Sequence, residues 1–124
     1  GYPWYGIQTA QHKAFFLAYH HKYNDHPRLG SVVGYTMIKS IAAGINKARS
    51  TDSEKLADAF AGLKLSSPFG NIIYRAQDHQ STMGAFLGIT KNDGGNGVMT
   101  DYHYVDGASV QPSDEQIKKL RAPN

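Results

Sequence analysis

The chain has 124 residues, of which 40% are hydrophobic and 19% are charged, and its formal net charge is +3. This length suits one ordinary domain with its own core, and the scattered lysines and arginines disfavour a nucleic-acid partner because they form no basic run interleaved with aromatic residues. The absence of cysteine excludes disulfides and thiolate metal ligands, and the apolar stretches are too short to cross a bilayer.

The first predicted element is a helix over residues 9–24, after an extended, turn-prone linker at residues 1–6. Thr9 has the side chain of a helix N-cap. Three aromatic residues recur at intervals of four and share one face of the helix: Phe15, Tyr19 and Tyr23. We interpret this stripe as core rather than as a surface on which a ligand stacks. A proline and a glycine within residues 24–30 then end the helix.

A second helix is predicted over residues 31–48. Its small and apolar residues follow a spacing of three and four, which gives the helix one face to bury. That face contains Gly34, Ile38, Ile41, Ala42 and Ile45. Ala43, Gly44 and Ala48 are small enough for a neighbouring element to approach the backbone closely, although a glycine inside a helix costs about 1 kcal/mol relative to alanine.

A third helix is predicted over residues 53–62. Thr51 and Glu54 have the spacing of a capping box, in which Thr51 accepts from the amide of Glu54 and Glu54 returns the bond. The buried stripe of this helix is expected to contain Leu56, Phe60 and Leu63. Gly62 stands where a left-handed C-terminal cap is least costly.

After Gly70 the hydrophobic pattern changes to a period of two, which predicts strands. The expected strands cover residues 71–76, 83–90 and 98–105. Residues 91–97, KNDGGNG, are predicted to form a hairpin loop because Asn, Asp and Gly tolerate positive φ. A phosphate-binding loop is disfavoured there, since no helix start or Lys-Ser pair follows. A capping box between Ser113 and Gln116 predicts a short last helix over residues 113–120.

No catalytic or metal constellation is recognisable in the sequence. G-x-S-x-G and H-E-x-x-H motifs and a cysteine nucleophile are absent, and the carboxylates stand at turns and helix starts, where capping explains them. The six histidines include no i, i+4 pair for zinc, so we interpret them as surface residues. Residues 78–80 are interpreted as a structural turn in which Asp78 bonds nearby backbone amides. We therefore expect no enzyme, no cofactor and no metal.

Residues 9–105 as a whole resemble the C-terminal part of the extracellular solute-binding proteins of bacterial ABC transporters, specifically the leucine/isoleucine/valine-binding type. No single motif would be specific, but five occur in the family's order and spacing. They are Phe15, Tyr19 and Tyr23; Gly34 and Tyr35; Ala43–Ala48; Ser50–Lys55; and Pro68–Gly70. The resemblance implies an α+β fragment of the type I periplasmic-binding-protein fold: three helices, a small and mainly antiparallel strand set, and a short C-terminal helix.

Members of this family have two α/β lobes joined by three crossovers, with the ligand in the cleft between them, and are longer than this chain. The resemblance implies that residues 5–80 complete the first lobe and residues 83–124 complete the second. It places one wall of the cleft at Leu29, Gly30, Ser31 and Tyr35. An apolar side chain and the free amides of a helix start suit that task. Alternatively, this loop merely turns the chain and Tyr35 packs within the lobe.

The implied function is non-catalytic: this would be the C-terminal part of the substrate-binding component of an ABC importer for amino acids or related small organic solutes, of the branched-chain type. The implied partners are the solute and the permease of the inner membrane, and the implied location is the periplasm, with a signal peptide that is not in this chain. The alternative is an autonomous small α+β protein-interaction module. Because both lobes would lack their parallel sheets, we also expect the isolated chain to form a homo-oligomer.

Overall fold

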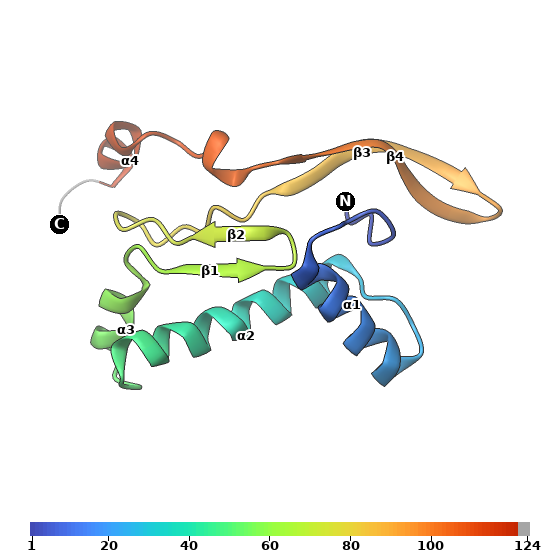
Figure 1. Cartoon of the computed structure of the whole chain (residues 1–124). Coiled ribbons are helices and arrows are strands. Elements are labelled where there is room, and N and C mark those ends of the chain that lie inside the picture. The colour runs from blue at the N-terminus through green and yellow to red at the C-terminus, as the bar shows by residue number, and fades with distance from the viewer. Residues whose placement is uncertain (122–124) are drawn as a thin grey trace.

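The computed structural model describes residues 1–121, in which helices pack beside two small antiparallel sheets (Figure 1). The elements in chain order are α1 (Ala10–Tyr23), α2 (Leu29–Ala48), α3 (Ser53–Phe60), β1 (Lys64–Ser67), β2 (Gly70–Ile73), β3 (Ala85–Asp93), β4 (Asn96–Val105), the 3-10 helix η1 (Gly107–Ser109) and α4 (Asp114–Leu120). This order confirms the predicted α+β class. Within the described residues, no helix is both long and apolar enough to cross a membrane.

Helix α1 begins as predicted, because the side chain of Thr9 accepts a hydrogen bond from the amide of His12 at 3.1 Å. Its aromatic stripe is only partly core: Phe15 is buried and Tyr19 is half-buried, but Tyr23 is 56% exposed. His12 is also buried, so the prediction that all six histidines lie at the surface was wrong. The ring of His12 packs edge-on against Tyr2, which helps to cover it. Tyr2 lies outside α1, so helical periodicity could not predict this contact.

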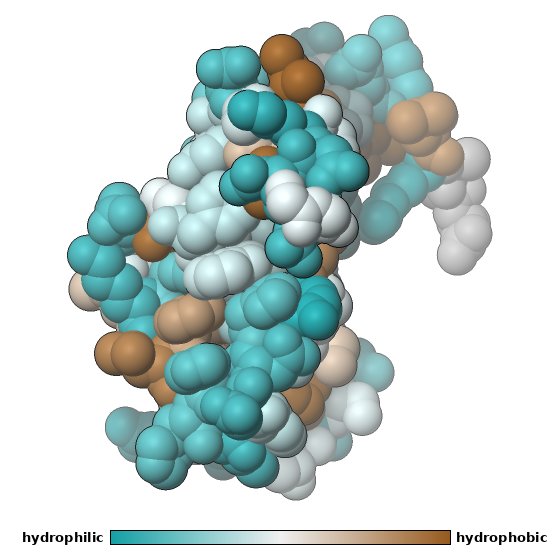
Figure 2. All heavy atoms as spheres, turned by 90° about the vertical axis from the view of Figure 1, so that its right-hand side faces the viewer, coloured by the Kyte–Doolittle hydropathy of each residue, from teal (hydrophilic) through white to brown (hydrophobic). Residues whose placement is uncertain are grey.

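Helix α2 buries a different face from the predicted one. The buried residues follow every fourth position: Val32, Thr36, Ser40 and Gly44. Ile38 and Ile41 of the predicted apolar face are instead 61% and 42% exposed. Helix α2 contacts α3 and β1 with its smaller residues because these permit a close approach. Figure 2 shows hydrophobic side chains at the surface on the helical side of the molecule.

Helix α3 is capped one residue later than predicted. Asp52, not Thr51, is the N-cap, and its carboxylate accepts from the amide of Lys55 at 3.1 Å. Both side chains are competent caps, and the carboxylate also favours the positive end of the helix dipole. At the other end, Lys47 of α2 donates to the carbonyls of Ala59 and Ala61 at 2.8 and 3.1 Å. Gly62 has the predicted positive φ, 71°.

The two sheets are hairpins. Strand β1 was not predicted; it pairs with β2 so that Leu65 lies opposite Ile72. The predicted strand over residues 71–76 ends at Ile73, beyond which Tyr74 forms only an isolated bridge with Ser81. The predicted loop over residues 91–97 contracts to two glycines, with φ of 57° and 87°, because positive φ at both positions suits the tight turn whose twist matches the strands.

The turn at residues 78–80 is structural, as predicted. Asp78 accepts from the amide of Gln80 at 3.0 Å and from both Nε and Nη2 of Arg75 at 3.2 and 2.7 Å. The hydrogen bonds from Arg75 are the largest cause that lowers the pKa of Asp78. His79 takes a φ of 58° within this turn. The polar groups of Asp78 and Arg75 therefore stabilise the turn.

One hydrophobic cluster connects the helices to both hairpins. Its buried members are Ile7, Phe15, Val32, Phe69 and Phe86. Phe69 of the β1–β2 turn meets Phe86 of β3 edge-on at 5.1 Å between ring centroids, a favoured aromatic arrangement. Ile7 directly follows residues 1–6, which were predicted to be a linker, and Pro3 within them is also buried. This segment therefore packs against the rest of the chain instead of serving only as a linker.

Candidate functional site

The four residues of the predicted wall lie in two different hollows. Leu29 borders a pocket of about 440 Å³, which we call the aromatic pocket. Ser31 and Tyr35 border a separate groove of about 500 Å³ between α1 and α2. Gly30 is exposed, and a Cβ there would meet nothing within 4 Å. The structure therefore does not bring these four residues together around one cavity.

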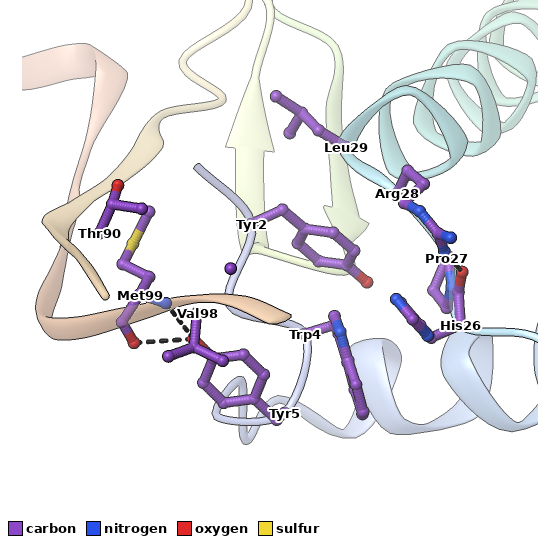
Figure 3. A pocket seen from close by; sticks show the side chains of 11 residues that line it. Tyr2, Trp4, Tyr5, His26, Pro27, Arg28, Leu29, Thr90, Val98 and Met99 are labelled. Carbon is purple, nitrogen blue, oxygen red and sulfur yellow. Dashed lines mark hydrogen bonds between the residues drawn. The ribbon is translucent and has the colours of Figure 1, made fainter. Parts of the chain in front are cut away.

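The aromatic pocket is formed by three parts of the chain that are distant in sequence (Figure 3). Its lining residues are Tyr2, Trp4 and Tyr5; His26, Pro27, Arg28 and Leu29; and Thr90, Gly97, Val98 and Met99. In Figure 3 the hairpin residues lie on one side and the residues before α2 on the other, with Tyr2 between them. The pocket is thus a cleft between the β3–β4 hairpin and the start of α2.

On the α2 side, the loop at residues 25–28 is held by its own polar groups. The amide of His26 donates to the Asp25 carboxylate at 2.7 Å, and the Arg28 guanidinium contacts the same carboxylate at 3.4 Å and donates to the His26 carbonyl. The hydrogen bond from the His26 amide, followed by Arg28, lowers the pKa of Asp25. The hydroxyl of Ser31 accepts from the amide of Arg28 at 3.2 Å. Ser31 therefore has a structural role at the helix start.

Trp4 stacks on two other rings. It stacks on Phe16 of α1 at 5.2 Å with an interplanar angle of 8°, and on His26 at 4.8 Å with an angle of 25°. Trp4 is therefore already engaged in two stacking contacts, which hold it in the wall of the pocket.

Tyr2 contributes its ring to the pocket while its hydroxyl is occupied elsewhere. The hydroxyl lies 2.7 Å from Nε2 of His12. Burial raises the pKa of Tyr2 to about 12 and lowers the pKa of His12. At neutral pH both the tyrosine and the imidazole are therefore uncharged, and they share this hydrogen bond. The pair contributes no charge to the pocket.

The hairpin side of the pocket is attached to the N-terminal segment through Tyr5. Its hydroxyl donates to the carbonyl of Met99 at 2.7 Å and accepts from the amide of Met99 at 2.6 Å (Figure 3). The remaining lining is apolar or aromatic, apart from Thr90, His26 and the cation of Arg28. Such a lining suits a small, largely apolar organic molecule.

The groove that Ser31 and Tyr35 border is built on the aromatic stripe of α1. Tyr35 packs on Phe15 at 4.9 Å between centroids and is 41% exposed. Tyr19 and Tyr23 line the same groove. Tyr35 thus joins α1 to α2, which agrees with the alternative interpretation that it packs within a lobe.

Sequence reasoning missed the residues of the N-terminal segment and of the hairpin. Trp4 and Tyr5 were assigned to a linker, although three aromatic side chains within residues 1–6 were an available signal. No signal pointed to Met99, because its contact with Tyr5 joins residues 94 positions apart.

Comparison with known proteins gives one family match. A family model described as periplasmic binding protein matches residues 1–96. No curated protein sequence is similar enough to count as a match.

Solved structures with a similar fold include three from one bacterial species. An ABC-type branched-chain amino acid transporter from Rhodopseudomonas palustris CGA009 superposes with a TM-score of 0.69 at 20% identity, over 82% of this chain and 28% of that one. A solute-binding protein of an ABC transporter from Rhodopseudomonas palustris BisB5, in complex with 3,4-dihydroxybenzoic acid, gives 0.68 at 22% identity, over 80% and 28%. An ABC transporter from Rhodopseudomonas palustris gives 0.57 at 26% identity, over 60% and 22%. The chain therefore spans less than a third of each of these structures.

Proposed function

The chain belongs to the periplasmic binding protein family, and from this premise we propose that it is the C-terminal part of the substrate-binding component of an ABC importer. The observation that carries the proposal is the family match over residues 1–96. That match leaves little basis for the alternative of an interaction module whose similarity is incidental. The proposed role is to capture a solute and deliver it, without chemistry. The partners would be a small-molecule solute and the permease of the inner membrane, and the location would be the periplasm.

The proposed solutes are amino acids of the branched-chain type or related small organic acids. Among the similar structures, one is named as a branched-chain amino acid transporter and another contains 3,4-dihydroxybenzoic acid. Both kinds of molecule join a carboxylate to a largely apolar body. The aromatic pocket supports this class through its apolar and aromatic lining. Arg28 contributes a guanidinium to that lining, although this guanidinium also contacts the Asp25 carboxylate.

Calorimetric titration of the full-length protein tests the solute class. Leucine, isoleucine, valine and 3,4-dihydroxybenzoate are added separately. Saturable binding of an aliphatic amino acid supports the branched-chain proposal, whereas binding of 3,4-dihydroxybenzoate alone replaces it with an aromatic acid. If none of the four binds, the proposed solute classes are wrong.

We further propose the division of the chain between lobes that the family implies: residues 5–80 in the first lobe and residues 83–124 in the second. The contact pattern supports it, since α1 and α2 pack on β1 and α2 packs on α3, whereas the most extensive contacts of β3 are with β4. The segment between the two groups includes Ser81, which bridges to Tyr74, and Thr82. A crossover at residues 81–82 would connect the lobes there.

Within this function, the predicted wall of Leu29, Gly30, Ser31 and Tyr35 stays a proposal, with Leu29 as its strongest member because it borders the aromatic pocket. Leu29 is 45% exposed, so its replacement should not disturb folding.

The first prediction is that Leu29→Glu in the full-length protein weakens binding of the solute identified above by about tenfold or more, roughly 1.4 kcal/mol. The reason is that a carboxylate, which must be desolvated, replaces an apolar contact with the apolar body of the solute. Leu17→Glu is the matched control, because Leu17 is 65% exposed on α1 and lies outside the pocket. Calorimetry that finds the affinity of Leu29→Glu within a factor of about two of wild type would remove Leu29 from the site.

A further inference from the structure

Two adjacent residues, Trp4 and Tyr5, are anchored on opposite sides of the aromatic pocket. Trp4 stacks on Phe16 of α1 and on His26 of the loop before α2. Tyr5 is hydrogen-bonded to Met99 of β4. A single peptide unit therefore connects the helical wall of the pocket with its hairpin wall.

The phenol of Tyr5 both donates a hydrogen bond to Met99 and accepts one from it. Its oxygen donates to the Met99 carbonyl at 2.7 Å and accepts from the Met99 amide at 2.6 Å. Both backbone groups lie on the edge of β4 that faces away from β3, where they have no ladder partner. One side chain thus satisfies two edge groups of an otherwise two-stranded sheet.

The packing beside Tyr5 holds the segment close to the same strand. The ring of Tyr5 meets the ring of Tyr102 edge-on at 6.2 Å. At Gly6 there is no room for a side chain, because a Cβ would lie 1.5 Å from the hydroxyl oxygen of Tyr102. The segment therefore lies directly against β4, and the Tyr5 hydroxyl fixes its register along the strand.

We propose that Tyr5 is a positioning residue that holds the β3–β4 hairpin at a set distance from α2 and so determines the width of the aromatic pocket. The proposal rests on the proposed function only for the identity of the pocket as a solute site. Under the proposed division of the chain, Met99 belongs to the second lobe, and Phe16 and His26 to the first. The Trp4–Tyr5 unit is then a link through which the separation of the lobes is set.

The test measures the distance between the two walls within one copy of the 124-residue chain, without any solute, in samples diluted with unlabelled chain so that distances between copies do not contribute. Since the chain has no cysteine, spin labels can be attached at cysteines introduced at two exposed positions, Lys39 of α2 and Lys91 of β3. Pulsed electron paramagnetic resonance then gives the distribution of distances between the labels. For Tyr5→Phe we expect this distribution to broaden about twofold or more, because the ring remains but the hairpin loses its hydroxyl anchor.

Two comparisons make the result specific. Tyr102→Phe is the matched control, since within residues 1–121 the Tyr102 hydroxyl makes no hydrogen bond, and we expect its distribution to equal that of wild type. Trp4 is the single tryptophan, so its fluorescence reports the other anchor and should not change in Tyr5→Phe. An unchanged distance distribution overturns the proposal, and so does a shift in Trp4 emission, which would mean that the whole segment has detached. Because no solute is used, neither result depends on the proposed function.

Discussion

At the scale of single residues, the pair of Tyr2 and His12 shows what burial does to a histidine. His12 is 2% exposed, and its only polar partner among side chains of the described residues is the hydroxyl of Tyr2. Burial is the main cause that lowers the pKa of His12, and a hydrogen bond with the backbone of Ile7 opposes it in part. Protonation of His12 would turn the acceptor of the Tyr2 hydrogen bond into a donor. The pair should therefore make folding sensitive to pH.

The sign of this dependence follows from the lowered pKa. The unfolded chain binds a proton at His12 near the ordinary value of about 6.5, whereas the folded chain binds it only at lower pH. The stabilisation is complete above about 6.5 and is lost as the pH falls toward the folded-state pKa. The second prediction is that the free energy of unfolding decreases from pH 7.5 to pH 5.5, and that His12→Gln reduces this slope. Asp25 and Asp78, whose pKa values are lowered from 3.8, titrate below this window.

Urea denaturation followed by circular dichroism at several pH values measures this slope. His21→Gln is the control, because His21 is exposed on the same helix. A slope for His12→Gln equal to that of His21→Gln would show that His12 does not carry the pH dependence.

At the scale of elements, the sequence predicted what local chemistry determines. The helices α1, α2 and α3 and the cap of α4 at Ser113 followed from periodicity and capping residues. Strand β1 was not predicted, because its four residues, two of them serines, show too little alternation of apolar and polar side chains to indicate a strand. The buried face of α2 was wrong for another reason. Periodicity identifies which side chains share a face, but which face is covered depends on the partner, and β1 and α3 cover the smaller residues.

Gly44 and Gly34 lie on the same helix and provide a matched pair. A Cβ at Gly44 would lie 2.7 Å from Cε2 of Phe60, whose ring is held edge-on against Tyr74 at 5.0 Å. A Cβ at Gly34 would meet nothing within 4 Å. The third prediction is that Gly34→Ala stabilises the chain by up to about 1 kcal/mol through helix propensity. Gly44→Ala should destabilise it by about 1 kcal/mol, because the overpacking cost of about 1 to 3 kcal/mol exceeds that gain.

Urea denaturation of both variants against wild type measures the two changes. Opposite signs would confirm that close contact between α2 and α3 requires a glycine at position 44. If both alanines stabilise equally, Phe60 moves aside at no cost and Gly44 has no packing role.

At the scale of the whole molecule, the site was less predictable than the fold. Leu29, which borders the aromatic pocket, was named through the resemblance to a family, and its role in binding stays a prediction. Tyr5 and Met99 were not reached, since a hydrogen bond between residues 94 positions apart leaves no periodicity or motif in either segment. Leu29 and Tyr35 border different hollows because of how α1 packs on α2. That packing cannot be predicted from the sequence of either helix by itself.

The exposed apolar face of α2 concerns the molecule as a whole. Val33, Met37, Ile38 and Ile41 are between 42% and 61% exposed and lie on one side of the helix. The chain spans 28% of the length of two similar solved structures, so in a longer protein other segments are available to cover this face. In the isolated chain the available cover is a second copy, and a hydrophobic surface of this kind favours association.

The last prediction is that the 124-residue chain forms dimers or larger oligomers whose mass rises with concentration in light scattering. Ile38→Glu should shift the population toward the monomer with little effect on the free energy of unfolding, because Ile38 is 61% exposed and a surface substitution usually changes stability by about 0.5 kcal/mol or less. Lys39→Glu, at the next and also exposed position, changes charge without removing apolar surface and should leave association nearly intact. A wild-type chain that stays monomeric at high concentration and binds no hydrophobic dye would contradict the prediction. Equal dissociation by both variants would indicate that charge, not the apolar face of α2, controls assembly.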